Sequence, residues 1–317
     1  MTKLPKNRLI RALLIAVSLA IIYSLIPLAT LYLKKDPTPY TNAAAIEKIK
    51  ARGIEGEYFA FLVFGDPHAG LFLNDSAALK IIRHMDREDR FQKIPIDFVM
   101  ALGDVSFRGS AWDYRIFNRL RSLIKWPVLS AFGNHDNDDK GGEAFFNKYI
   151  GSAEFSFSDR NSYFIFLNNE TGNLDEGQFK RFEDELKISA PYKHRFVMLH
   201  KPPISPYQQS WYRPELNPWA YRFMKMCEAY KVDIVFSGHE HMFKKGVYGG
   251  VRYITSGGGG NIIHFPTSDG GYLHYLVVRV YGDYVDYEVR RVFPPLWEYF
   301  IYYLWKDIFY AISGAVF

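Results

Sequence analysis

Five short apolar runs in this sequence each end abruptly in polar side chains. The clearest of them begins at Val128 and ends in Gly133, Asn134, His135 and Asp136. A short β-favouring run followed by glycine and polar groups is typical of a buried strand that reaches the carboxyl edge of a sheet. An amide, an imidazole and a carboxylate are poorly suited to packing there. Together, however, they can hold a metal, donate a proton and orient the donor.

The other four runs end in Asp or His in the same manner. These polar ends are Asp66 and His68 after the run 58–64, Asp104 after 96–102, His200 after 196–199, and His239 with His241 after 234–236. Helical patterns separate the first three runs, at 76–86, with Asn74 and Asp75 as its cap, and at 112–124. This alternation predicts parallel strands joined by right-handed crossovers. Because the carboxyl ends of such strands share one edge of a sheet, we expect these side chains to meet there.

The later part of the chain predicts more strands with shorter connections. Strands are expected at 155–158, 163–167, 251–255, 273–281 and 284–292, and helices at 143–149, 175–186 and 219–230. Strands joined by short, glycine-rich turns suggest a second sheet that is partly antiparallel. The fold class that we predict is α/β, a two-sheet α/β sandwich with helices outside, formed by residues 58–293.

Seven of the polar residues at these strand ends are of types that bind first-row metals. They are Asp66, His68, Asp104, Asn134, His200, His239 and His241. Three carboxylate or amide oxygens and four imidazoles are too many for one tetrahedral zinc. They suit two ions a few ångströms apart, with Asp104, alone at its strand end, as the bridging carboxylate. Oxygen and nitrogen ligands of this kind admit Mn, Fe or Zn. The remaining histidines, His84, His194, His264 and His274, are expected on the surface or in the core.

The motifs in this order resemble the signature of the calcineurin-like metallophosphoesterases, over about residues 58–292. The matching residues are Asp66-x-His68, Gly103-Asp104, Arg108-Gly109, Gly133-Asn134-His135-Asp136, His200 and Gly238-His239-x-His241. The resemblance implies a two-sheet fold with a dinuclear metal centre that hydrolyses phosphoric esters. It assigns Asp66, His68, Asp104 and His241 to one ion, and Asp104, Asn134, His200 and His239 to the other. It further implies that His135 is the general acid and that Asp136 holds its ring.

One position departs from the pattern of the protein phosphatases in that family. They usually have Asp directly before the Arg-Gly pair, and this chain has Phe107. The difference argues against a serine/threonine protein phosphatase. Arg108 could bind the phosphate as a bidentate donor, and a surface ion pair is the alternative. In the expected mechanism a metal-bridging hydroxide attacks the phosphorus, and His135 protonates the leaving oxygen.

The segment from Leu9 to Leu33 is almost entirely apolar and long enough to cross a bilayer as a helix. We predict an uncleaved N-terminal transmembrane anchor over 1–35 and a linker or stalk over 36–57, with a cleaved signal peptide as the alternative. A helical pattern at 43–52 could belong to the stalk or be the first helix of the domain. Basic residues are more frequent before the anchor than after it, which favours a catalytic domain on the extracytoplasmic side of the membrane.

Residues 294–317 are rich in Tyr and Trp, and charged residues interrupt their apolar pattern. Such aromatic side chains favour the bilayer–water interface, so we expect an aromatic C-terminal helix that lies on the membrane surface. A packed core helix and a second membrane span are the alternatives. The lipid bilayer is therefore an expected partner. The formal net charge is only +5, and no basic stripe with interleaved aromatic residues is present, so no nucleic acid is expected.

The stretch between His200 and the helix at 219–230 is rich in Pro, Tyr and Trp, and we expect it to form a rim or lid of the substrate pocket. Tyr207, Trp211 and Tyr212 could stack on a base or cover an acyl chain, or simply pack the loop. Three functions remain open. They are a membrane-tethered hydrolase of a lipid-linked phosphomonoester or phosphodiester, the same hydrolase acting on soluble or cyclic nucleotides, and a non-catalytic metal-binding scaffold.

Overall fold

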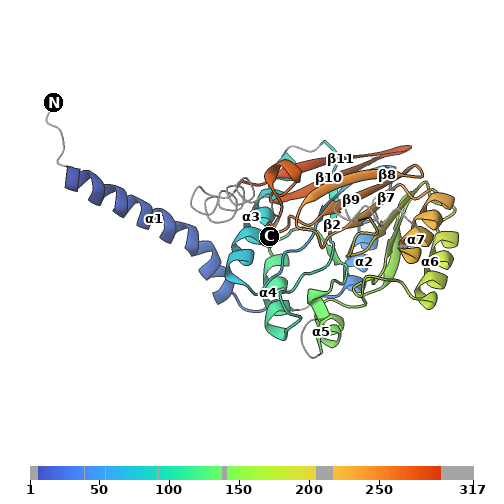
Figure 1. Ribbon diagram of the computed structural model, residues 1–317, viewed down its shortest axis with the longest axis horizontal. Helices are drawn as coiled ribbons and strands as arrows, with labels where there is room; N and C mark the ends of the chain where they lie inside the picture. The colour runs from blue at the N-terminus through green and yellow to red at the C-terminus, as the bar shows by residue number, and fades with distance from the viewer. Residues whose placement is uncertain are drawn as a thin grey trace.

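Two β-sheets lie face to face, and helices cover the outer face of each sheet (Figure 1). The computed structural model describes residues 6–38, 40–53, 55–90, 93–137, 141–204 and 217–293. Two mixed sheets between layers of helices confirm the predicted two-sheet α/β sandwich.

The first sheet has the strand order β11-β10-β1-β2-β3. Its strands are β1 (Tyr58–Phe64), β2 (Ile96–Ala101), β3 (Val128–Ser130), β10 (His274–Tyr281) and β11 (Tyr284–Arg291). The first three are parallel, as the alternation of strands and helices predicted. β10 pairs antiparallel with β1, and β11 with β10. The last two strands therefore extend the first sheet at the edge of β1, whereas their short turns had suggested the second sheet.

The second sheet has the strand order β4-β5-β6-β7-β9-β8. Its strands are β4 (Phe155–Asp159), β5 (Ser162–Phe166), β6 (His194–Met198), β7 (Ile234–Ser237), β8 (Phe243–Tyr248) and β9 (Val251–Ser256). The four inner strands are parallel, and the edge strands β4 and β8 run antiparallel to their neighbours. β8 was not predicted because Lys244, Lys245 and Gly246 interrupt its apolar pattern, and its backbone pairing with β9 holds it in place.

Strand β1 explains how the sheets and the outer helices share one apolar run. Its residues alternate between two cores, with Phe59, Phe61 and Val63 between the sheets, and Ala60, Leu62 and Phe64 under the helices. Successive side chains of a strand point to opposite faces, so a strand covered on both faces must be apolar throughout.

The outer layers consist of helices, and three of them begin at a side-chain cap. The outer helices are α3 (Phe72–Met85), α4 (Ala111–Arg121) and α5 (Gly142–Tyr149) beside the first sheet, and α6 (Glu176–Ile188) and α7 (Pro218–Ala229) beside the second, with short 3-10 turns at Glu88–Arg90, His135–Asn137 and Thr267–Asp269. Asp175 caps α6 as expected, in a capping box with Gln178. Helix α3 begins earlier than predicted, and Asn74 and Asp75 lie inside its first turn, because their side chains bond to other segments.

Two helices precede β1. Helix α1 (Lys6–Leu33) extends away from the body (Figure 1), and its carboxyl end packs on α3 and α4 through Leu28 and Leu31. Helix α2 (Asn42–Ala51) places Ala45 and Ile49 in the core between the sheets, so it is part of the folded body. No helix in the described part of the chain combines the length and the apolarity that crossing a membrane requires. The aromatic helix expected at 294–317 lies outside the described residues.

Candidate metal centre

The carboxyl ends of β1, β2, β3, β6 and β7 bring six of the predicted ligands together with His135. These side chains form three sets, and within each set one ligand atom per residue lies within 4.8 Å of the others. The sets are Asp66, His68 and His241; His68, Asp104 and His135; and Asp104, His200 and His239. His68 and Asp104 each belong to two sets, so the three sets are neighbours and Asp104 lies centrally among them.

The ring nitrogens of His200 are placed as those of a metal ligand. Its Nδ1 lies 2.9 Å from the carbonyl oxygen of Leu102, which can only accept, so Nδ1 carries a proton. Its Nε2 lies 3.2 Å from Asp104 Oδ2. A neutral ring would thus point a lone pair at a carboxylate oxygen, and this contact is favourable only with a proton or a metal cation at that point.

His241 is oriented in a similar way on the other side of the centre, but its Nε2 also accepts a hydrogen bond from Asn261 Nδ2 at 3.0 Å. Its Nδ1 lies 2.8 Å from the carbonyl oxygen of Ile262, and its Nε2 lies 3.8 Å from Asp66 Oδ1. The ring of His68 is 1% exposed, its Nε2 lies 3.2 Å from Asp104 Oδ2, and neither ring nitrogen makes a hydrogen bond within the described residues. These buried nitrogen and oxygen atoms form a donor set that fits divalent cations.

The pKa shifts of Asp66 and Asp104 also indicate a cation site. Burial raises the pKa of Asp66 well above its usual range, and the charge of Asp104 raises it further. Burial acts on Asp104 as well, but His200 and His68 outweigh it and lower the pKa of Asp104 well below the usual range. Burial opposes a charge on His200, yet Asp104 raises the pKa of His200 to about 9. The centre therefore needs positive charge, which protons or metal cations can supply.

The backbone brings the ligands close by adopting conformations that most residues avoid. Asp66, His68, Asp104 and His239 have φ angles of 61°, 44°, 48° and 68°. Such left-handed conformations in non-glycine residues are concentrated at functional sites. Gly133 allows a close approach, because a β-carbon there would lie 2.2 Å from Asp104 Oδ1. The next residue, Asn134, has a buried Oδ1 without a hydrogen-bond partner in the described structure, as expected for a ligand oxygen.

The Asp136 carboxylate has hydrogen-bond partners other than the His135 ring that it was expected to hold. The carboxylate accepts hydrogen bonds from the backbone amides of Val105, Ser106 and Gly133 and from the Ser106 hydroxyl, so it joins two ligand loops. The ring of His135 is oriented by a different group, since its Nδ1 lies 3.1 Å from the carbonyl oxygen of Phe107. Asp136 is fully buried, and amide donors satisfy its oxygens better than a half-buried imidazole would.

Phe107 and Arg108 line the same side of the centre. The Phe107 ring is stacked near His135 at a centroid distance of 6.5 Å, and the exposed Arg108 guanidinium lies 5.1 Å from the Phe107 centroid. Phe107 thus provides an apolar wall beside His135. The predicted rim residues Tyr207, Trp211 and Tyr212 lie outside the described residues, and their contact with substrate stays a prediction.

Three residues near the ligands were missed by the sequence reading. Asn261 Nδ2 lies 3.0 Å from His241 Nε2, and the ring of His264 stacks 5.1 Å from that of His241. Asn169 accepts the amide of His200 at 3.0 Å. We had expected His264 on the surface or in the core. The four glycines before Asn261 were the available signal, because such a run permits close backbone approach.

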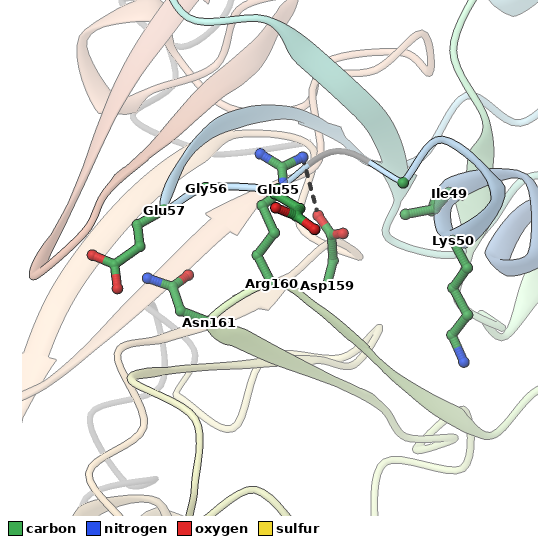
Figure 2. A pocket seen from close by; sticks show the side chains of 9 residues that line it. Ile49, Lys50, Glu55, Gly56, Glu57, Asp159, Arg160 and Asn161 are labelled. Atoms are coloured by element: carbon green, nitrogen blue, oxygen red, sulfur yellow. Dashed lines mark ion pairs between the residues drawn. The ribbon is translucent and has the colours of Figure 1, made fainter.

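A charged hollow lies at the opposite end of β1, and we name it the amino-end hollow. It is lined by residues of the α2–β1 connection, such as Glu55 and Glu57, and by Asp159, Arg160 and Asn161 of the β4–β5 hairpin (Figure 2). The Arg160 guanidinium forms an ion pair with Asp159, drawn in Figure 2, and another with the buried Asp97. Opposite charges meet directly there.

Known proteins resemble this chain in structure and in sequence pattern. The chain is similar in structure to GAP50, the anchor in the inner membrane complex of Plasmodium, with 12% identity, a TM-score of 0.58, and coverage of 75% of this chain and 89% of that chain. It is also similar to phosphopantetheinyl hydrolase of Mycobacterium tuberculosis, with 14% identity, a TM-score of 0.44, and coverage of 64% and 91%. At 12% identity the likeness to GAP50 concerns the fold alone. No curated protein matches the sequence.

The family model described as calcineurin-like phosphoesterase matches residues 59–243, from β1 to the start of β8. That match covers more than half of the 317 residues and contains every residue of the three ligand sets. The chain therefore belongs to the calcineurin-like phosphoesterase family.

Proposed function

We propose that this chain is a metal-dependent phosphoric ester hydrolase with two cations at the carboxyl edge of the sandwich. One observation carries the proposal. His200 points Nε2 at Asp104 Oδ2 over 3.2 Å, while its Nδ1 donates to a backbone carbonyl 2.9 Å away. A core histidine would be expected to use both nitrogens in hydrogen bonds, whereas a metal ligand keeps one lone pair directed at the cation.

The proposed assignment divides the ligands between two ions. Asp66, His68, Asp104 and His241 would hold one ion, and Asp104, Asn134, His200 and His239 would hold the other. Asp104 is the proposed bridge, and its membership in two of the three ligand sets supports that role. The backbone amide of His135 donates to the second oxygen, Asp104 Oδ1, at 2.8 Å, and so fixes the carboxylate plane.

Bound at this centre, divalent cations would acidify a water molecule and take up charge on the phosphoryl oxygens. The chain's own contribution is the proton. His135 donates from Nδ1 to the Phe107 carbonyl, which orients the ring, and Nε2 of the protonated ring would give its proton to the departing oxygen of the ester. The Phe107 ring shields that side from water, and the exposed Arg108 guanidinium is available to a phosphate oxygen.

We also propose that α1 holds the body at a membrane, which would favour a lipid-linked or other amphiphilic ester. Ile15, Leu19, Ile22 and Ile26 are each more than half exposed, and their spacing places them on one face of the helix. A row of exposed aliphatic side chains on a helix that extends from the body supports contact with lipid acyl chains. An extracytoplasmic location for the catalytic body stays a prediction.

The experiment that tests the function measures hydrolysis by the full chain in detergent with Mn²⁺. The substrates are a chromogenic phosphodiester, a phosphomonoester, a cyclic nucleotide and a phospholipid in vesicles. Turnover of the phospholipid above the others supports the amphiphilic substrate, and turnover of the nucleotide above the others supports the soluble alternative. Mn²⁺ binding without hydrolysis of any substrate would identify a scaffold and overturn the proposal.

His135→Ala tests the proton donor in the same assay. We expect kcat for an alkyl phosphate ester to fall by about 10² to 10⁴, and much less for a nitrophenyl leaving group that needs no proton. Mn²⁺ binding should be retained. His84→Ala, which removes a half-buried histidine bonded to Tyr275, is the control and should keep the native rate. An alkyl ester hydrolysed at the native rate by His135→Ala would refute this role.

A further inference from the structure

The carboxyl end of α1 is connected to the ligand loop after β1 by a short chain of hydrogen bonds. The hydroxyl of Tyr32 donates to Asp75 Oδ2 at 2.5 Å. The other oxygen of that carboxylate, Oδ1, accepts the backbone amide of Gly70 at 3.0 Å. Gly70 lies two residues after His68, so one buried carboxylate joins the helix to the loop that carries Asp66 and His68.

That loop is hydrogen-bonded along its length to its neighbour, the loop after β2. The amides of His68 and Ala69 donate to the carbonyls of Asp104 and Val105, each at 3.0 Å. In the other direction, the amide of Phe107 donates to the carbonyl of Ala69 at 2.9 Å. The two loops therefore form one unit that contains the proposed bridging ligand.

The conformation of Gly70 explains why a hydrogen bond from outside the loop is needed to stabilise it. Its φ is +107°, and a β-carbon there would lie 2.1 Å from Asp113 Oδ1, so glycine is required. Glycine restricts its own backbone least of all residues, and the amide of Gly70 depends on Asp75 for its partner. Asp75 is fully buried, and burial raises its pKa to about 6, whereas the bonds from Tyr32 and Gly70 favour its charged form.

We propose that Tyr32 is a positioning residue for the metal centre, acting through Asp75 and Gly70 on the loop that carries His68. This inference rests on the proposed metal centre and deepens it. The carboxyl end of α1 would then help to position the metal ligands, in addition to connecting the helix to the body. Without the hydroxyl, a buried carboxylate loses a donor, turns or takes up a proton, and releases the Gly70 amide.

The contacts of Tyr32 allow its hydroxyl to be removed separately from its packing. Its carbonyl accepts from Arg119 at 2.6 Å, and its ring is stacked on Trp112 at a centroid distance of 6.3 Å. Leu28 and Leu31 anchor the preceding turn in the core. Tyr32→Phe keeps all of these contacts and removes one hydrogen bond.

The test uses the full chain with Tyr32→Phe and measures two quantities. Hydrogen exchange of the segment 66–70, followed without metal by mass spectrometry, should become about tenfold faster. The dissociation constant for Mn²⁺ should rise about tenfold, in the range seen when groups that support a ligand are removed. Lys34→Met is the control, because it removes a 2.9 Å hydrogen bond to Ser122 at the same helix end without touching Asp75. It should change neither quantity.

A second variant shows whether Tyr32 acts through Asp75. In Asp75→Asn the further change Tyr32→Phe should have no added effect on exchange or on Mn²⁺ binding. A lower unfolding temperature of Tyr32→Phe with native exchange and native Mn²⁺ affinity would mean a merely structural contact and would overturn the inference. Because exchange is measured without metal or substrate, this result is distinct from a failure of the proposed hydrolysis.

Discussion

The two ends of the first sheet differ in the side chains that form ion pairs with their buried carboxylates. At the carboxyl end, the ion-pair partners of Asp66 and Asp104 within the described residues are imidazoles, of His68, His200 and His241. At the amino end, the partners of the equally buried Asp97 are guanidinium groups, of Arg52 and Arg160. An arginine keeps its charge at any pH that proteins meet, whereas a histidine carries charge only when protonated.

This difference separates a structural ion pair from a candidate site better than burial does. At the amino end, the charge of Asp97 is compensated by two arginine side chains. At the carboxyl end, the two acids form ion pairs with imidazoles alone among the described residues, so compensating positive charge there comes from protons or from metal ions. Three substitutions test this contrast.

Asp104→Ala should have the largest effect. We expect both Mn²⁺ ions to be lost and hydrolysis to fall by a factor on the order of 10⁴ or more, because the proposed bridge holds both ions. Elemental analysis of the purified variant and a rate measurement check this. Asp283→Ala, in the exposed β10–β11 turn, is the matched control and should keep metal and rate. If Asp104→Ala retained two ions, the proposal that Asp104 bridges them would be refuted.

Asp97→Ala should act on stability and leave the chemistry intact. It leaves the Arg160 guanidinium, whose side chain is 6% exposed, with Asp159 as its ion-pair partner in the described part of the chain and with a hydrogen bond to the Tyr58 carbonyl. We expect the free energy of unfolding to fall by about 2 to 4 kcal/mol, because half of a buried ion pair is left uncompensated. Denaturant titration measures the loss, and Mn²⁺ affinity below the unfolding transition should be unchanged.

The control for Asp97→Ala is Asp286→Ala. It removes an exposed partner of Arg279, 3.6 Å away, and should change the free energy of unfolding by less than about 1 kcal/mol. If Asp97→Ala released the metals while the free energy of unfolding stayed native, it would be wrong to assign stability to the amino end of the sheet and metal binding to the carboxyl end.

Asp159→Asn should give the smallest effect, with a defined pH dependence. Burial raises the pKa of Asp159 to about 6, so the folded protein binds this proton more tightly than the unfolded chain does. The ionised carboxylate therefore lowers stability as the pH rises from about 4 to 6 and beyond. Asparagine removes that effect, and we expect a gain of about 1 kcal/mol near pH 8, after allowance for partial exposure, and almost none near pH 4. Equal gains at both pH values would contradict the assignment.

Much of the centre could be predicted because each ligand follows a strand. A buried strand must be apolar throughout, so the change to Asp66 or Asp104 marks the point where the chain leaves the core, and parallel strands bring such points together. The start of α3 could not be predicted in this way. Asn74 and Asp75 have the composition of a cap, but their partners, Asn261 and Tyr32, come from distant parts of the chain.

The role of Asp136 shows the same limit at the centre itself. Its neighbour His135 suggested a local partner, whereas packing of the β2 and β3 loops supplies three amides and a hydroxyl that are closer in space. The final strands were misplaced for a related reason. Short turns between β10 and β11 determine that they pair with each other, but the vacant edge of β1 determines which sheet they join.

The sequence by itself determined the kinds of ligand, their order and the strands that they follow, because these depend on local composition and on the two-residue period of a strand. Only the tertiary structure decided which imidazole nitrogen faces each carboxylate, which group orients His135 and that Tyr32 reaches the ligand loop. Those features depend on the directions in which side chains approach from separate elements, and packing between the sheets and helices sets these directions.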